Sequence, residues 1–150
     1  MCICVIAFCP LAHAQSLQEQ DICAKQAQKA FEYWRGDDKK MPRQQMPILP
    51  DTQTITLKEE YQSHYNTRIK KCLVLIEYNT QNEGETHVNK VLLDAFERRY
   101  YGYYLWTSRP GKKVWEVPPI SCELAPSFQE QTNCTSTEAF DAFVAKYMEE

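Results

Sequence analysis

Residues 71–76, Lys71-Cys72-Leu73-Val74-Leu75-Ile76, decide the fold of this chain. The apolar residues of this segment follow one another without alternation, and the segment has the length of a strand. A run of this kind is typical of a central β-strand whose two faces are both covered. Polar residues 79–86 then predict a turn, and residues 88–96 and 99–107 predict two further strands.

Two secondary structures suit the residues immediately before this run. Leu57, Tyr61 and Tyr65 have helical spacing. Tyr61, Ser63 and Tyr65 would equally share one face of a strand that turns at residues 66–67. The sequence leaves both alternatives open.

The tyrosine-rich segment 100–106 is the most distinctive feature of the chain. Strand alternation predicts two faces with these members: Tyr101, Tyr103 and Leu105 on one, and Tyr100, Tyr104 and Trp106 on the other. Aromatic side chains are enriched at protein interfaces, and a flat aromatic face also suits a sugar ring. We therefore take Tyr101, Tyr103 and Trp106 as candidate contact residues. The alternative is that the domain itself covers both faces.

A long segment at residues 35–54 contains three prolines, which exclude regular helix and central strand. A connection of this length is unusual inside a compact domain, so it either wraps the surface or binds something. Met46 and Ile48 lie on its apolar side and complete the set of candidate contact residues. The alternative is that they dock on the domain's own core. Residues 113–117 predict a short edge strand that ends at two prolines.

Amphipathic helices are predicted at both ends of the chain. The first covers residues 17–34 and begins with a capping box made by Ser16 and Glu19. The second lies near the C-terminus and begins with a capping box made by Thr135 and Glu138. Strands grouped between helices predict an α+β domain, in which the helices pack on one face of an antiparallel sheet of three to five strands.

Residues 1–14 have the pattern of a cleavable export signal. An uncharged apolar run is followed by Ala12-His13-Ala14, and small residues at these two alanine positions suit signal peptidase. No basic residue precedes the run, and a buried N-terminal strand is the alternative. Cleavage would leave residues 15–150 as a single disulfide-stabilised domain without a membrane anchor, in the periplasm or secreted.

The cysteines predict two disulfides. Three of the seven cysteines lie within residues 1–14, and the remaining even number in an exported domain is typical of a disulfide framework. The four that remain are Cys23, Cys72, Cys122 and Cys134. They allow three connectivities, and we prefer Cys23–Cys72 with Cys122–Cys134. The first pair would attach the N-terminal helix to the central strand, and the second would close a short loop.

Composition and motifs point away from several function classes. A net charge of −3 gives no reason to expect the positive patch on which nucleic-acid binding depends. His64 and His87 lack the clustered spacing of metal ligands, so we predict no metal site and no cofactor. The enzyme alternative is a small hydrolase that uses His64, with Asp94 or Glu97 as its partner.

Three segments carry a resemblance to known sequences: residues 61–66, 71–76 and 93–97, which read Tyr-Gln-Ser-His-Tyr-Asn, Lys-Cys-Leu-Val-Leu-Ile and Leu-Asp-Ala-Phe-Glu. Together they resemble a group of short, uncharacterised secreted bacterial proteins, and the resemblance covers most of the chain after residue 14. It implies a bacterial, extracytoplasmic setting and transfers no function.

The sequence therefore favours a non-enzymatic extracytoplasmic binding or inhibitor-type module over an enzyme. An extracytoplasmic protein is its predicted partner. A passive envelope protein without a specific ligand is a further hypothesis.

Overall fold

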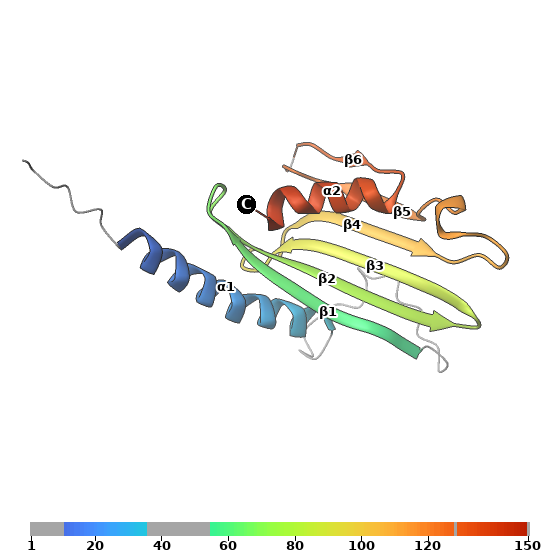
Figure 1. Cartoon of the computed structure of the whole chain (residues 1–150), viewed down its shortest axis with the longest axis horizontal. Coiled ribbons are helices and arrows are strands. Elements are labelled where there is room, and N and C mark those ends of the chain that lie inside the picture. The colour runs from blue at the N-terminus through green and yellow to red at the C-terminus, as the bar shows by residue number, and fades with distance from the viewer. Residues whose placement is uncertain (1–10, 36–54, 128, 150) are drawn as a thin grey trace, which may run out of the picture.

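The computed structural model describes residues 11–35, 55–127 and 129–149. The described residues form two α-helices, one 3-10 turn and six strands (Figure 1). In chain order these are α1 (Leu11–Arg35), β1 (Ile55–Asn66), β2 (Lys71–Asn82), β3 (Glu85–Asp94), β4 (Tyr100–Thr107), η2 (Val114–Glu116), β5 (Ser121–Leu124), β6 (Thr132–Asn133) and α2 (Thr137–Met148). The α+β class with a helix at each end is confirmed, although the sheet has six strands instead of three to five.

The sheet is an antiparallel meander in which every strand pairs with its neighbour in the chain, in the order β1-β2-β3-β4-β5-β6. Residues 55–66 and 71–78 lie in two strands joined by a turn at 67–70, so the strand alternative is right and the helical one wrong. The β2–β3 hairpin closes through Glu83 and Gly84, whose φ angles are 49° and 84°. Positive φ at both central residues is the geometry that matches the twist of paired strands.

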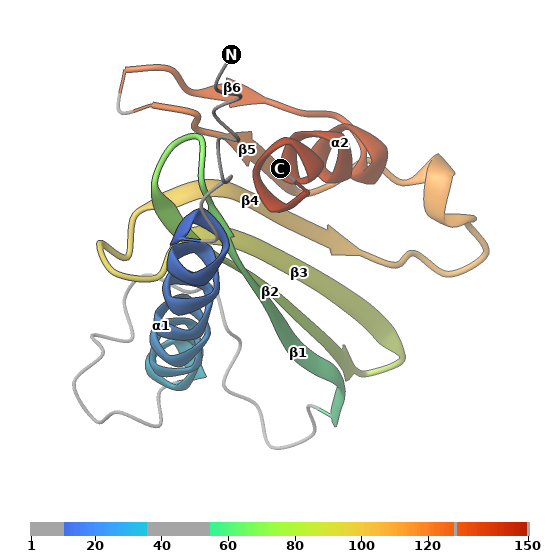
Figure 2. The ribbon, with the colours of Figure 1, turned by 60° about the vertical axis from the view of Figure 1, so that its left-hand side comes forward.

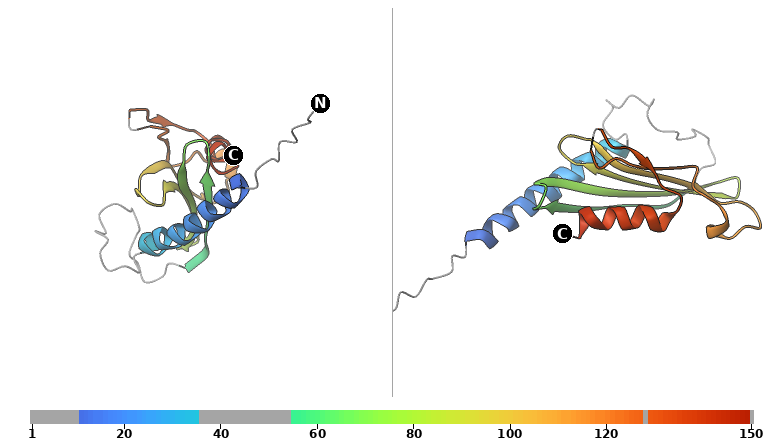
Figure 3. Two further views of the ribbon diagram at one scale, coloured as in Figure 1. Left: turned by 90° about the vertical axis from the view of Figure 1, so that its left-hand side faces the viewer. Right: turned by 90° about the horizontal axis from the view of Figure 1, so that it is seen from above.

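β2 is buried on both of its faces, as its unbroken apolar run predicts. Cys72, Val74 and Ile76 pack with α1, whereas Leu73 and Leu75 pack with α2. The two helices therefore lie on opposite sides of the sheet, as the right-hand view of Figure 3 shows. The prediction that both helices pack on one face is wrong. Successive side chains of a strand point to opposite faces, and all of residues 72–76 are apolar, so each face of β2 needs its own cover.

α1 begins at Leu11, six residues earlier than the sequence predicts. Ser16 therefore lies within the helix and does not cap it. The helix also continues across residues 14 and 15, where cleavage of the export signal is predicted; the signal itself stays a prediction. Towards its C-terminus, the ring of Phe31 packs 4.7 Å from that of Tyr61, and the ring of Trp34 packs 5.4 Å from that of Tyr78.

A β-bulge in β4 changes the faces of the tyrosine-rich segment. Leu92 pairs with Gly102 and Leu93 pairs with Tyr100, so that Tyr101 is an extra residue on this strand. Such a bulge shifts the alternation of side chains by one residue. Tyr101 consequently joins the α2 side of the sheet, while Tyr103 lies on the α1 side. The predicted shared face of Tyr101 and Tyr103 is wrong for this reason.

The region after β4 also differs from the sequence-based expectation. Residues 114–116 form a 3-10 turn where a short strand is predicted, and the edge of the sheet is made instead by β5 and β6. These two strands are too short to give a periodic signal, and their pairing accompanies the Cys122–Cys134 bond. α2 is capped by Ser136, whose hydroxyl accepts from the Ala139 amide, and not by Thr135.

Both preferred disulfides are confirmed. Cys23–Cys72 joins α1 to β2 with the Cα atoms 5.2 Å apart, and Cys122–Cys134 joins β5 to the residue that follows β6. Cys23 and Cys72 are both buried in the apolar layer between α1 and the sheet. The first bond therefore fixes the helix to the sheet at the point where its apolar face makes contact.

Removal of each disulfide should lower the stability by a different amount, because the two bonds close loops of different length. The Cys23–Cys72 bond closes a separation of 49 residues and the Cys122–Cys134 bond one of 12. Loop entropy predicts that the double variant Cys23→Ala/Cys72→Ala loses about 4 kcal/mol of unfolding free energy, and Cys122→Ala/Cys134→Ala about 3 kcal/mol. Urea denaturation of the two variants beside the oxidised wild type measures this difference. A larger loss for the second variant would contradict the assignment.

Candidate binding site

The described part of the chain has a surface hollow of about 460 Å³ on the α1 side of the sheet, over β4 and β5. Of the described segments, α1 covers β1 and β2 on this side, and the hollow opens beyond them. Its lining comes from the β3–β4 turn, β4, β5 and the segment after β5: Glu97, Arg99, Tyr100, Gly102, Tyr103, Glu123, Ala125, Ser127 and Gln131.

Two tyrosines from β4 form the aromatic part of the hollow. The bulge places Tyr100 opposite Leu93, and so on the same side of the sheet as Tyr103. Burial raises the pKa of Tyr103, and the nearby charge of Glu123 raises it further. Burial also raises the pKa of Tyr100, and the adjacent phenol of Tyr33 adds to the rise. Both phenols therefore stay protonated at neutral pH and can donate hydrogen bonds.

Glu123 supplies the acidic part of the hollow. It lies directly opposite Tyr103 in the β4–β5 register. Its carboxylate accepts hydrogen bonds from the Gln131 side-chain amide at 2.8 Å and from the Ser121 hydroxyl at 3.3 Å. Both donors are uncharged, and the two hydrogen bonds orient the carboxylate. A carboxylate has about four lone-pair positions, and capacity therefore remains for donors on a ligand.

The floor of the hollow depends on a glycine and an arginine. A Cβ at Gly102 would lie 3.1 Å from a ring carbon of Phe140 on the α2 side, so the close packing of α2 requires glycine at this position. Arg99 donates to the Ala125 carbonyl at 3.4 Å, and its guanidinium lies 4.7 Å from the ring centre of Tyr101. These contacts hold the β3–β4 turn against the segment after β5.

The predicted contact residues fall in different places. Tyr103 lines the hollow, but Tyr101 and Trp106 are buried against α2 with exposed fractions of 4% and 7%. The prediction that these two belong to an exposed aromatic face is wrong. On the α2 side, the domain itself covers the aromatic residues of β4. Met46 and Ile48 lie outside the described residues.

Sequence reasoning missed Tyr100, Glu123 and Gln131 as lining residues. Alternation assigns Tyr100 to the wrong face because a bulge has no sequence signal of its own here. Glu123 lies at the site because β5 pairs with β4, and Gln131 lies there because it precedes β6, which pairs with β5. The aromatic richness of β4 was the one signal that pointed to this region.

The residues of the hydrolase alternative are separated by the register of the sheet. His64 pairs with Leu73 on the neighbouring strand, and Leu73 pairs with Asp94 on the next. Two strand spacings place His64 and Asp94 about 10 Å apart. The fully buried Leu73 stands between them.

Asp94 and Glu97 are engaged in other contacts. Asp94 Oδ1 accepts from the amides of Phe96 and Glu97 at 2.8 and 2.9 Å and so closes the β3–β4 turn. Its Oδ2 lies 3.3 Å from the Lys71 ammonium, an ion pair without hydrogen-bond alignment. Lys71 also binds the Glu97 carboxylate, and this hydrogen bond raises the pKa of Lys71, with the nearby Asp94 carboxylate adding to the rise.

Comparisons with known proteins add nothing to this geometry: neither family models, nor curated proteins, nor solved structures match the chain. The resemblance to secreted bacterial proteins therefore stays a prediction. Within the described residues, no helix is long and apolar enough to cross a membrane, and no three metal-ligating side chains cluster.

The contacts of Asp94 predict a structural role. Asp94→Ala leaves two turn amides without their acceptor and removes one of the two carboxylates beside the partly buried Lys71, so we expect a loss of about 3 kcal/mol in unfolding free energy. Glu97→Gln, which weakens a more exposed pair with the same lysine, is the matched control and should change stability by less than about 1 kcal/mol. Equal stability of the Asp94→Ala protein and the wild type in urea would refute this role.

Proposed function

We propose that this chain is a non-enzymatic, extracytoplasmic binding module whose ligand occupies the hollow over β4 and β5. The observation that carries the proposal is the pairing of an aromatic wall, Tyr100 and Tyr103, with the carboxylate of Glu123, which two uncharged donors orient. The size of the hollow falls in the range of small-molecule sites.

The chemistry of the lining selects a class of ligand. Tyrosine rings offer flat apolar surface, while Glu123 accepts hydrogen bonds and Gln131 and Ser127 carry donors. A molecule with one apolar face and several hydroxyl groups satisfies both requirements, as a sugar ring does. We therefore propose a saccharide as the ligand.

A binding role is favoured over hydrolysis by the contacts of the acidic residues. Asp94 is committed to the β3–β4 turn and to Lys71, and Leu73 stands between it and His64. His64 lies on the α2 side of the sheet, since it pairs with Leu73, whereas the hollow lies on the α1 side. A general base must be within hydrogen-bond reach of the group that it activates.

The extracytoplasmic setting is supported by the two disulfides and by the pattern of residues 1–14. Disulfides form and persist in oxidising compartments such as the periplasm and the extracellular space. We propose one of these as the location.

Saturation-transfer NMR with a panel of mono- and oligosaccharides tests the proposal on the oxidised protein. Tyr100 is 42% exposed, so Tyr100→Ala should leave the fold intact and weaken saccharide binding about tenfold through loss of ring stacking. Glu123→Gln keeps the shape of the carboxylate but removes its charge and one acceptor, and should also weaken binding.

Phe96→Ala provides the matched control. Phe96 is an exposed aromatic residue in the adjacent β3–β4 turn, and it does not line the hollow. Its substitution should leave saccharide binding unchanged. If no saccharide binds the wild type, or if Phe96→Ala weakens binding as much as Tyr100→Ala does, the proposed site is wrong.

A further inference from the structure

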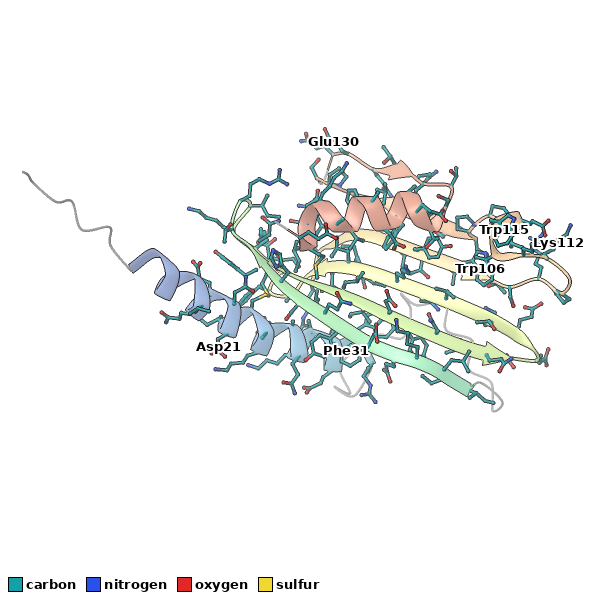
Figure 4. All side chains as sticks on the ribbon, in the orientation of Figure 1. Asp21, Phe31, Trp106, Lys112, Trp115 and Glu130 are labelled. Atoms are coloured by element: carbon teal, nitrogen blue, oxygen red, sulfur yellow. A yellow bond between two sulfur atoms is a disulfide. The ribbon has the colours of Figure 1, made fainter. Side chains whose placement is uncertain are left out.

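The loop between β4 and β5, residues 108–120, carries a second exposed surface at the far end of the molecule. We call it the tryptophan loop. Trp115 is 78% exposed, the largest fraction among the exposed large apolar residues of the described chain, and Ile120 and Val114 on the same loop are 66% and 55% exposed. Figure 4 shows Trp115 and Lys112 at the outer end of the molecule, beyond the buried Trp106.

This exposure is fixed by hydrogen bonds within the loop. The Trp106 indole donates to the Val117 carbonyl at 2.9 Å, and Val117 is itself buried. The Lys113 amide donates to the Glu116 carboxylate at 2.8 Å, and the Ile120 amide donates to the Leu105 carbonyl at 2.8 Å. The loop is thus held to the end of the sheet while Trp115 is exposed, and Figure 2 shows the loop between β4 and β5 projecting from the sheet.

The charge of the loop is opposite to that of the whole chain. Arg109, Lys112 and Lys113 contribute three positive charges and Glu116 one negative charge, so the loop carries +2 while the chain carries −3. The Lys113 ammonium lies 5.1 Å from the ring centre of Trp115. A lysine ammonium at this distance makes a cation–π contact with the exposed indole.

We infer that the tryptophan loop binds an anionic lipid surface, with Trp115 at the level of the headgroups. Tryptophan favours the interface between membrane and water, and basic side chains near it are attracted by anionic headgroups. The loop is smaller than the roughly 20–30 residues that each side of a standard protein interface contributes. A lipid surface needs no complementary shape, and a few apolar and basic residues suffice to hold a protein on it reversibly.

The charges near the loop define the orientation of the bound protein. Glu83 and Glu85 lie on the β2–β3 hairpin, whose Thr86 exchanges hydrogen bonds with Ser108 at the base of the loop. Anionic lipids repel these two glutamates. The hairpin and the loop lie at the same end of the sheet (Figure 1), so binding requires an orientation in which the tryptophan loop is nearer to the lipid surface than these two glutamates.

The three tryptophans of the chain provide an intrinsic probe. Trp34 and Trp106 are 8% and 7% exposed, so a change in fluorescence on binding reports on Trp115. We expect a blue shift and quenching by brominated acyl chains when the protein is mixed with phosphatidylcholine vesicles that contain phosphatidylglycerol. Vesicles of phosphatidylcholine alone should give a much smaller shift, and added salt should reverse the binding to the anionic ones.

Variants separate the apolar and the charged contributions in vesicle co-sedimentation. Trp115→Ala should lower the partition coefficient about tenfold. Lys112→Gln/Lys113→Gln should lower it by roughly fivefold for each charge removed. The matched control Lys29→Gln/Lys146→Gln removes the same charge from exposed positions on the two helices, and should bind as the wild type does.

Two results would overturn the inference. One is that the wild type does not bind anionic vesicles. A photo-crosslinker at position 115 that captures an acidic protein, while vesicle binding is absent, would show that the loop has a protein partner instead. The other is that the control double variant loses as much binding as Lys112→Gln/Lys113→Gln, which would indicate attraction by overall charge alone. Saccharide binding by the hollow is measured separately and does not affect either result.

Discussion

The burial of β2 on both faces is the constraint on which the rest of the structure depends. Five consecutive buried residues of β2, 72–76, alternate between two apolar layers, so the sheet cannot be stable with a cover on one side only. α1 closes one layer and α2 the other, and the first and last described helices therefore lie on opposite sides of the sheet. The Cys23–Cys72 bond adds a covalent link between the first helix and this same strand.

The two covers are unequal, and this inequality creates the candidate site. α1 lies over β1 and β2, while the described residues of β4 and β5 on the same side border a hollow. On the opposite side α2 packs so closely that Gly102 is required beneath Phe140. The bulge at Tyr101 then sends one tyrosine into the α2 layer and leaves Tyr100 and Tyr103 together at the hollow. The site is thus a consequence of how the sheet is covered.

Sequence reasoning succeeded where a signal is local and strong. The β2 run and the helices at both ends follow from apolar patterns, and the even number of cysteines after residue 14 predicts two disulfides. It failed where a single residue changes the pattern, as at the bulge in β4, and where elements are too short to be periodic, as in β5 and β6. It also misplaced the N-cap of α2 by one residue, since Thr135 and Ser136 are both suitable caps and only packing selects between them.

The sequence by itself determined the α+β class and the central strand, because each depends on apolar patterns that are sufficient at short range. It left three pairings of the four cysteines open, and only the tertiary structure decided between them. The tertiary structure decided which faces the tyrosines occupy, which residues border the hollow and that Trp115 lies outside the core. Those outcomes depend on the register between strands and on the area that each helix can cover. Both are set by packing between residues distant in the chain, to which no local pattern in the sequence corresponds.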